Sequence, residues 1–165
     1  MTQATGFGFE VGTRLEGEGG RSGVITTPHG TIRTPAFIPV GTQATVKGVT
    51  PEEMAALGAQ AVLANAYHLY LQPGADIVDT AGGLGQFMNW PWPTFTDSGG
   101  FQVMSLGSGF KKVIAMSVER AEDDEATAGD RERLSRVDDD GVTFKSHLNG
   151  SMHRYTPEIS MQVQH

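Results

Sequence analysis

Residues 61–74 read AVLANAYHLYLQPG, and residues 93–106 read PTFTDSGGFQVMSL. Each stretch opens with a short apolar segment, at 61–64 and at 93–96, that predicts a strand. Pro73 and Gly74 break the chain before a short predicted helix at 75–80, and a glycine-rich loop is expected at 82–85. Strand, loop, helix and strand at this spacing are typical of β/α units around a parallel sheet. The sequence therefore predicts an α/β fold.

A different layer is predicted before this stretch. Apolar and β-branched segments predict strands at 7–11, 23–26, 31–34 and 35–40. Pro28-His29-Gly30 predicts the turn that joins the second strand to the third, and prolines bound the fourth. We therefore expect an antiparallel β layer that precedes the main fold.

Two segments carry helix-start signals. Thr50 and Glu53 fit a reciprocal capping box with Pro51 at the first helical position, and Gly58 is expected to end that helix. Residues 142–148 alternate as a strand, and Thr156 then opens a second helix, with no terminator before the last residue. A parallel unit should continue beyond that helix, so we expect the chain to be the N-terminal portion of a longer single domain.

The net charge of −7 is concentrated in one segment. Residues 119–140 contain ten acids and four arginines and therefore carry −6 of it. The rest of the chain is near neutral, so the acidic average does not argue against an RNA partner, whose phosphates bind local Lys and Arg. We expect residues 118–140 to form a solvated, mobile acidic insert; the functional alternative is a docking tail.

Composition excludes several classes of site. The sequence contains no cysteine, so it holds no disulfide, no Cys-ligated zinc and no cysteine nucleophile. No apolar run approaches the roughly 18 residues of a membrane helix, and residues 1–8 lack the features of a secretory signal. The histidines show no HxH or HExxH spacing, so no metal site is expected within this chain. We expect a cytoplasmic protein that does not contact membranes.

The most informative residues for chemistry are Asp97-Ser98-Gly99-Gly100-Phe101. In a β/α barrel, Asp97 would lie at the carboxyl end of its strand, where such folds place reactive groups. The two glycines let the backbone approach a ligand and offer N–H donors, and Phe101 supplies a flat apolar face. These groups suit a purine, through hydrogen bonds and stacking of about 1–3 kcal/mol each. The alternative is that Asp97 only caps its own turn.

A second cluster follows the strand at 61–64. Asn65 is a polar group at a strand end and is expected to line the same opening as Asp97. Tyr67 and His68 come next, and for these two residues a hydrogen-bonded packing role is the favoured alternative to a functional one.

Four long motifs lie at 27–54 (TPHGTIRTPAFIPVGTQATVKGVTPEEM), 57–74 (LGAQAVLANAYHLYLQPG), 82–106 (GGLGQFMNWPWPTFTDSGGFQVMSL) and 141–158 (GVTFKSHLNGSMHRYTPE). Together they resemble the N-terminal part of the bacterial tRNA-guanine transglycosylase family, also called queuine tRNA-ribosyltransferase. The resemblance covers residue 7 to the end apart from the acidic insert. It implies a (β/α)8 TIM barrel of which this chain supplies the first few strands. It also implies exchange of the guanine at the tRNA wobble position for a deazaguanine precursor of queuosine.

The resemblance assigns roles to individual residues. Asp97 matches the active-site aspartate that acts as proton acceptor, and residues 97–101 match the base-binding loop, whose last, aromatic residue stacks on the purine. Asn65 matches a pocket residue near that aspartate, and Val40 and Leu63 match apolar residues near the ribose.

The resemblance also locates what this chain lacks. The family's nucleophilic aspartate, further base-reading residues and a Cys3His zinc site would lie beyond the last residue, so no cofactor is expected within the chain. The implied partners are tRNA, guanine or a deazaguanine base, and a second copy in a homodimer of the full-length protein. We therefore expect the 165 residues alone to be inactive and poorly stable, because an open part-barrel exposes apolar edges.

Two other functions remain compatible with the motifs. One is a non-catalytic accessory or tRNA-binding homologue that lacks the nucleophile. The other is the archaeal relative, which acts elsewhere on tRNA, although the motifs are closer to the bacterial ones. An aspartate nucleophile and zinc ligands in the residues that follow position 165 would favour an enzyme over the non-catalytic homologue.

Overall fold

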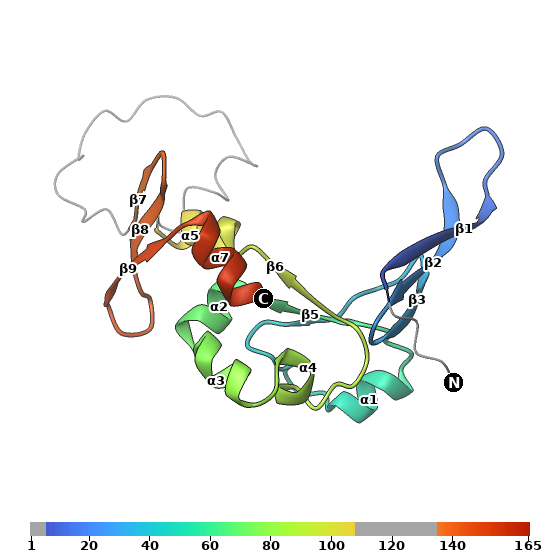
Figure 1. The fold of residues 1–165 in the computed structure, drawn as a ribbon, viewed down its shortest axis with the longest axis horizontal. Helices are drawn as coiled ribbons and strands as arrows, with labels where there is room; N and C mark the ends of the chain where they lie inside the picture. The colour runs from blue at the N-terminus through green and yellow to red at the C-terminus, as the bar shows by residue number, and fades with distance from the viewer. Residues whose placement is uncertain (1–5, 108–134) are drawn as a thin grey trace, which may run out of the picture. The chain divides into compact units, whose positions relative to one another are not determined.

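The computed structural model describes residues 6–107 and 135–165 (Figure 1). The chain divides into two compact units, Met1–Asp97 and Ser98–His165. Within the described residues, the first unit holds an antiparallel and a parallel sheet, and the second holds an antiparallel sheet with helices α5 and α7. The fold is mixed α/β, as the sequence predicts.

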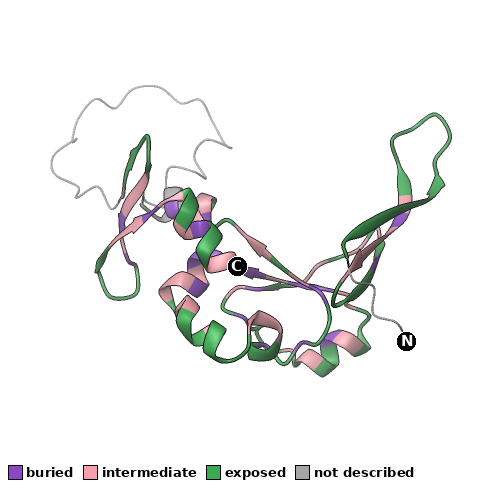
Figure 2. Ribbon diagram, in the orientation of Figure 1, coloured by how far each residue is buried: buried purple, intermediate pink, exposed green. Residues whose placement is uncertain are grey.

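The first sheet has the strand order β1-β2-β3, with bounds Gly8–Arg14, Arg21–Thr27 and Gly30–Thr34. Phe9, Ile25 and Ile32 align across the three strands. Ile32 is 1% exposed, whereas β1 is exposed along its whole length and appears green in Figure 2. The turn between β2 and β3 requires Gly30, whose φ is +127°, and the Thr27 hydroxyl donates to its carbonyl. The expected antiparallel layer is confirmed.

The strand expected at 35–40 is largely absent, because β4 covers only Val40–Gly41. Pro35 and Pro39 have no N–H to donate to a ladder, and Phe37 between them is 84% exposed. The pairing begins at the end of this segment, where the Pro39 carbonyl accepts the Leu63 N–H at 2.9 Å. Apolar composition alone therefore overestimated the strand.

The second sheet is parallel, with order β4-β5-β6; β5 spans Val62–Asn65 and β6 spans Thr94–Asp97. The register pairs Val40 with Leu63 and Asn65 with Asp97. Strand β5 is the buried centre: Val62 and Ala64 are 0% exposed, as is Ala61 just before it, and much of the strand is purple in Figure 2. The β/α connections expected around a parallel sheet are present as α1 before β5 and as α2, α3 and α4 between β5 and β6.

These helices are short and locally determined. Helix α1 (Pro51–Ala56) has the expected capping box: the Thr50 side chain accepts the Glu53 N–H, and the Glu53 carboxylate accepts the Thr50 N–H. Helix α2 spans Ala66–Leu71, and α3 spans Ala75–Thr80 as expected. The loop expected at 82–85 is only partly correct: Gly82 and Gly83 have positive φ, and α4 (Leu84–Phe87) begins directly after them.

The second unit begins with α5 (Gly100–Gly107). Its sheet has the order β7-β8-β9, with bounds Ser135–Asp138, Gly141–Lys145 and Met152–Tyr155, and α7 follows at Pro157–Gln164. The strand predicted at 142–148 ends earlier than expected, and β9 had no clear sequence signal because its residues are mixed in polarity. The predicted helix start at Thr156 is confirmed, since its side chain accepts the Ile159 N–H at 3.3 Å.

The expectation of a mobile acidic insert at 118–140 is wrong for its last residues. Residues 118–134 lie outside the described residues, but 135–138 form β7, and a two-residue turn joins it to β8. The turn is held by Asp138, whose carboxylate accepts the N–H groups of Asp140 and Gly141, both at 3.1 Å. The acidic residues 138–140 therefore belong to a hairpin turn and not to a charged loop.

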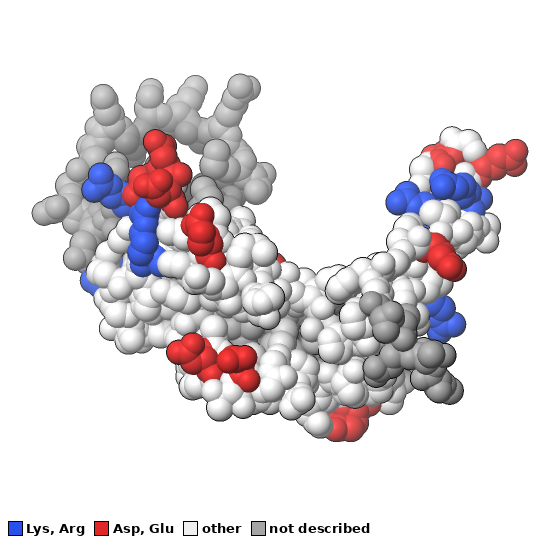
Figure 3. All heavy atoms as spheres, in the orientation of Figure 1, with Lys and Arg blue, Asp and Glu red and all other residues white. Residues whose placement is uncertain are grey.

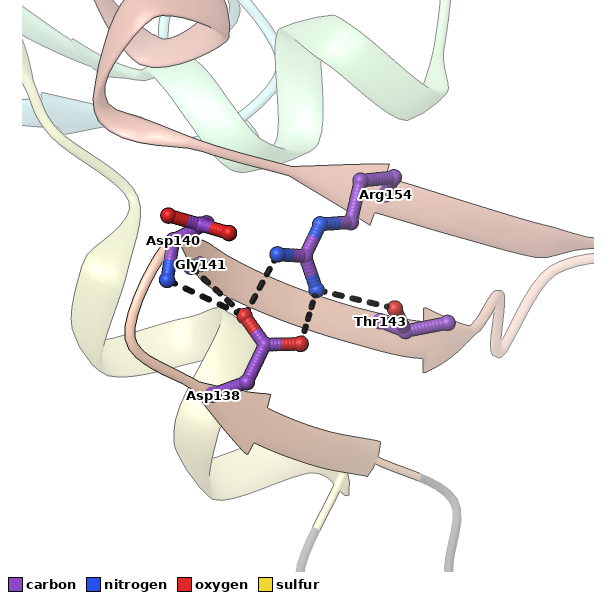
Figure 4. A network of polar contacts seen from close by, with 5 residues as sticks. All are labelled: Asp138, Asp140, Gly141, Thr143 and Arg154. Carbon is purple, nitrogen blue, oxygen red and sulfur yellow. Dashed lines mark hydrogen bonds and ion pairs between the residues drawn. The ribbon is translucent and has the colours of Figure 1, made fainter.

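Asp138 also binds Arg154 of β9 through two hydrogen bonds of 2.7 and 2.5 Å (Figure 4). The same guanidinium donates to the Thr143 hydroxyl at 3.1 Å, so one arginine links all three strands. The hydrogen bond from Arg154 is the main reason that the pKa of Asp138 falls from 3.8 to about 2.

In the part of the chain that the structure describes, no helix is long and apolar enough to cross a membrane.

Candidate active site

Asn65 and Asp97 end two neighbouring parallel strands at the same level of the sheet. The register pairs them directly, so both side chains emerge at the carboxyl edge. The Asn65 Nδ2 group donates to Asp97 Oδ2 at 2.5 Å, and the Ala66 N–H donates to Asp97 Oδ1 at 3.0 Å. The expected proximity of Asn65 and Asp97 is therefore confirmed as a direct contact.

The orientation of the Asn65 amide is determined by its two partners. Its oxygen accepts the His68 N–H at 3.2 Å and so caps helix α2, while its nitrogen faces the carboxylate. A flipped amide would set oxygen against oxygen and N–H against N–H. Asn65 is 4% exposed and is enclosed in the fold, whereas Asp97 is half-buried and retains some exposure to solvent.

Asp97 does not cap its own turn. That turn is closed by Ser98, whose hydroxyl oxygen accepts the Gly100 N–H at 3.3 Å. The structural alternative raised by the sequence is therefore wrong in its stated form, although Asp97 does bind the first N–H of α2. The Asp97 carboxylate thus binds the start of α2 from its position at the carboxyl end of β6.

The residues after Asp97 belong to the second unit. Gly99 is buried and has φ +69°, a conformation that favours glycine. The Gly100 N–H, expected to be an available donor, is instead bound by Ser98. Phe101 is 66% exposed at the start of α5, so its ring is available for stacking.

The carbonyl of Ser98 has two partners that the sequence did not suggest. The Tyr155 hydroxyl donates to it at 3.1 Å, and the Ser160 hydroxyl donates at 2.8 Å. Nothing local in the sequence links these residues, because they lie 57 and 62 positions away along the chain. The sequence shows only that Tyr155 and Ser160, both with hydroxyl groups, lie on either side of the start of α7. This pattern does not indicate which group they bind.

The other predicted residues fall into two groups. Val40 and Leu63 are register partners in β4 and β5, and Val40 is 56% exposed at the sheet edge. Tyr67 is 1% exposed and packs edge-on against His68 at 5.2 Å between ring centroids, which supports the packing interpretation for Tyr67. Burial also raises the pKa of the Tyr67 hydroxyl above its ordinary value.

Charges of both signs occur on each antiparallel sheet. Figure 3 shows basic and acidic side chains side by side on the β1–β2 hairpin and on the β7–β9 sheet. The charged residues of the first hairpin are Glu10, Arg14, Glu16, Glu18 and Arg21. Neither sheet presents a uniformly basic surface on this face, so phosphate contacts there would depend on single Lys and Arg side chains. Within residues 6–107 and 135–165, no three His, Asp or Glu side chains are grouped so that they could hold a metal ion.

Comparison with known proteins identifies the family. The family model described as queuine tRNA-ribosyltransferase matches residues 16–165, which is most of the chain. The chain belongs to the queuine tRNA-ribosyltransferase family. A family member from Moorella thermoacetica is 52% identical over 156 residues, which are 94% of this chain and 35% of the relative. Family members from Herpetosiphon aurantiacus and Gloeobacter violaceus are 51% and 49% identical, covering 87% and 96% of this chain and 30% and 35% of their own length.

The family membership confirms the resemblance drawn from the four motifs. The chain spans about a third of the length of these curated relatives. Asn65 and Asp97 both lie inside the matched range, as does the whole segment 97–101.

Proposed function

We propose that these residues belong to an enzyme that replaces guanine in tRNA with another base, and that Asp97 transfers the proton. The observation that carries the proposal is the half-buried Asp97 carboxylate, held by Asn65 at the carboxyl edge of a parallel sheet in a chain of this family. The relatives are named queuine tRNA-ribosyltransferase, which supports a base-exchange reaction on tRNA. The alternative, a non-catalytic homologue, would show no base exchange in the test below.

The chemistry requires two displacements. In the first, a carboxylate nucleophile from outside this chain bonds to ribose C1′ as the C1′–N9 bond to guanine breaks. In the second, N9 of the incoming base bonds to C1′ and the carboxylate leaves, which restores the original configuration. The departing guanine takes up one proton and the incoming base releases one. Asp97 is assigned to this proton transfer, a contribution of about 10²–10⁴-fold.

Base recognition is assigned to the residues around Asp97. Its carboxylate accepts hydrogen bonds from N–H groups of the purine, and Asn65 keeps it at the strand edge. Ser98, Gly99 and Gly100 form the backbone of the base-binding loop, in which the exposed Phe101 ring stacks on the base. The wobble guanine and a deazaguanine precursor of queuosine are the proposed outgoing and incoming bases. Val40 and Leu63, paired in the parallel sheet, are assigned to the ribose.

The remaining proposals concern the whole protein. Strands β4, β5 and β6 are assigned as successive strands of a (β/α)8 barrel, because they are parallel, adjacent in order and joined by helices. The residues of this chain do not fit the expected zinc site, since the sequence has no cysteine. Zinc binding is therefore assigned to residues outside it. A homodimer of the full-length protein and action on tRNA in the cytoplasm complete the proposal.

The test is incorporation of labelled guanine into tRNA by the protein expressed from its complete reading frame. Asp97→Asn should reduce the rate at least about 100-fold, because the amide cannot accept the proton. Asp76→Asn is the matched control, since it neutralises an exposed carboxylate on α3 in the same unit. A rate for Asp97→Asn within tenfold of the parent, or an equal loss in Asp76→Asn, would contradict the assignment.

A further inference from the structure

The carbonyl of Ser98 is held by two buried side chains of the second unit. Tyr155, the last residue of β9, is 5% exposed, and Ser160 in α7 is 6% exposed. Their hydroxyls donate to the same oxygen at 3.1 and 2.8 Å. A carbonyl oxygen has two lone pairs, so this acceptor is fully used.

The direction of the Ser160 hydroxyl is set by a further contact. The Gln164 Nε2 group donates to Ser160 Oγ at 3.1 Å and to the Ser160 carbonyl at 3.2 Å. Since Ser160 Oγ already accepts from Gln164, its own proton is directed at Ser98. Gln164 lies one helical turn after Ser160, so helix α7 itself orients the donor.

Fixing the Ser98 carbonyl fixes a whole peptide plane. In a trans peptide the C=O and the following N–H point in opposite directions, so the Gly99 N–H is directed away from Tyr155 and Ser160. The next groups are also engaged: Ser98 Oγ accepts the Gly100 N–H, and the Gly99 carbonyl accepts the Val103 N–H at 3.1 Å. The first turn of α5 therefore begins from a rigid peptide.

We infer that Tyr155 and Ser160 are positioning residues for the base-binding loop. They do not touch the base; they hold the Ser98–Gly99 peptide and, through it, the start of α5 and the Phe101 ring. This inference rests on the proposed function, because it takes base binding as the role of the loop that these residues hold. Stacking on a purine depends on ring offset, so a loop that moves binds the base less tightly.

The substitutions that test this remove one hydroxyl each. In the protein expressed from its complete reading frame, Tyr155→Phe and Ser160→Ala should each raise the KM for free guanine about three- to tenfold. The kcat should stay within about twofold, because Asp97 and its partners belong to the other unit. Ser160→Thr keeps the hydroxyl and should restore most of the guanine affinity.

Ser146→Ala is the matched control. Ser146 lies in the same unit as Ser160 and is 4% exposed, so Ser146→Ala also removes a serine hydroxyl from a buried position. Its oxygen accepts the Leu148 N–H at 3.2 Å, within its own turn. This variant reports general destabilisation of the unit and should leave the KM for guanine unchanged.

A second readout does not depend on activity. Amide hydrogen exchange of a peptide covering 98–103 should be faster in Tyr155→Phe and in Ser160→Ala than in the parent or in Ser146→Ala. Unchanged KM and unchanged exchange at 98–103 in both variants would overturn the inference, as would an equal KM effect in Ser146→Ala. Absence of guanine exchange by the parent protein would instead overturn the proposed function, and the base-binding role with it.

Discussion

At the scale of single residues, the contact between Asn65 and Asp97 makes a prediction about stability. Asn65→Ala removes the cap of α2 and a hydrogen bond to a carboxylate, so it should cost about 1–3 kcal/mol in the free energy of unfolding. Asn65→Asp should cost more, because it sets a second carboxylate against Asp97. Denaturant unfolding of each variant measures both effects.

The exchanged pair is the control for that series. The double variant Asn65→Asp, Asp97→Asn reverses the two groups, so an amide again donates to a carboxylate. It should be more stable than Asn65→Asp alone and yet remain as inactive in guanine exchange as Asp97→Asn. A double variant no more stable than Asn65→Asp would contradict a direct hydrogen bond between the two positions.

Asp138 predicts a pH dependence. Its pKa is lowered to about 2 by Arg154, so the unfolded chain binds its proton more readily than the folded chain. The stabilisation is complete above the ordinary pKa of 3.8 and is lost as the pH falls from about 4 toward about 2. Asp138→Asn should remove this component of the acid sensitivity, measured as unfolding midpoints across that range. An identical pH profile in the variant and the parent would contradict the ion pair.

At the scale of elements, the N-cap residues of α1 and α7 should contribute differently to stability. Thr50→Ala breaks a reciprocal capping box and should destabilise by about 1 kcal/mol. Thr156→Ala removes the cap bond to the Ile159 N–H and a side-chain hydrogen bond with the exposed Glu158. Ile159 at the third helical position cannot return a bond to the Thr156 N–H, so this substitution should cost less. Unfolding free energies decide the order. A larger loss in Thr156→Ala would show that the reciprocal bond from Glu53 contributes nothing.

Elements with local signals were predicted well from the sequence. The capping box, the Pro28-His29-Gly30 turn and the breaks around α3 all lie within a few residues of the structure they determine. Strand β9 was not predicted because its residues are mixed in polarity, although its partner β8 is close in the chain. The short extent of β4 was not predicted because apolar composition does not reveal the missing N–H groups of Pro35 and Pro39. In the candidate site, Asn65 and Asp97 were predicted from their strand ends. The contacts of Ser98 were not, because no local pattern couples residues so far apart.

At the scale of the whole molecule, the isolated 165 residues should show no guanine exchange into tRNA. The proposed nucleophile is not among them, and the parallel sheet has exposed apolar side chains on its outer strands, with Val40 at 56% and Phe95 at 38%. The isolated chain should therefore bind a hydrophobic dye and associate as its concentration rises. Exchange above background, measured with labelled guanine, would contradict the first expectation. A dye-free monomer at high concentration would contradict the second.

Gly141 gives the hairpin turn an influence beyond its own strands. Its φ is +154°, and a methyl group there would collide with the backbone oxygen of Tyr155. A side chain at this position would push the end of β9 outward and carry the phenol with it. An alteration in this turn would thus reach the proposed base-binding loop indirectly, and variants at Gly141 would mimic the loss of the Tyr155 hydroxyl.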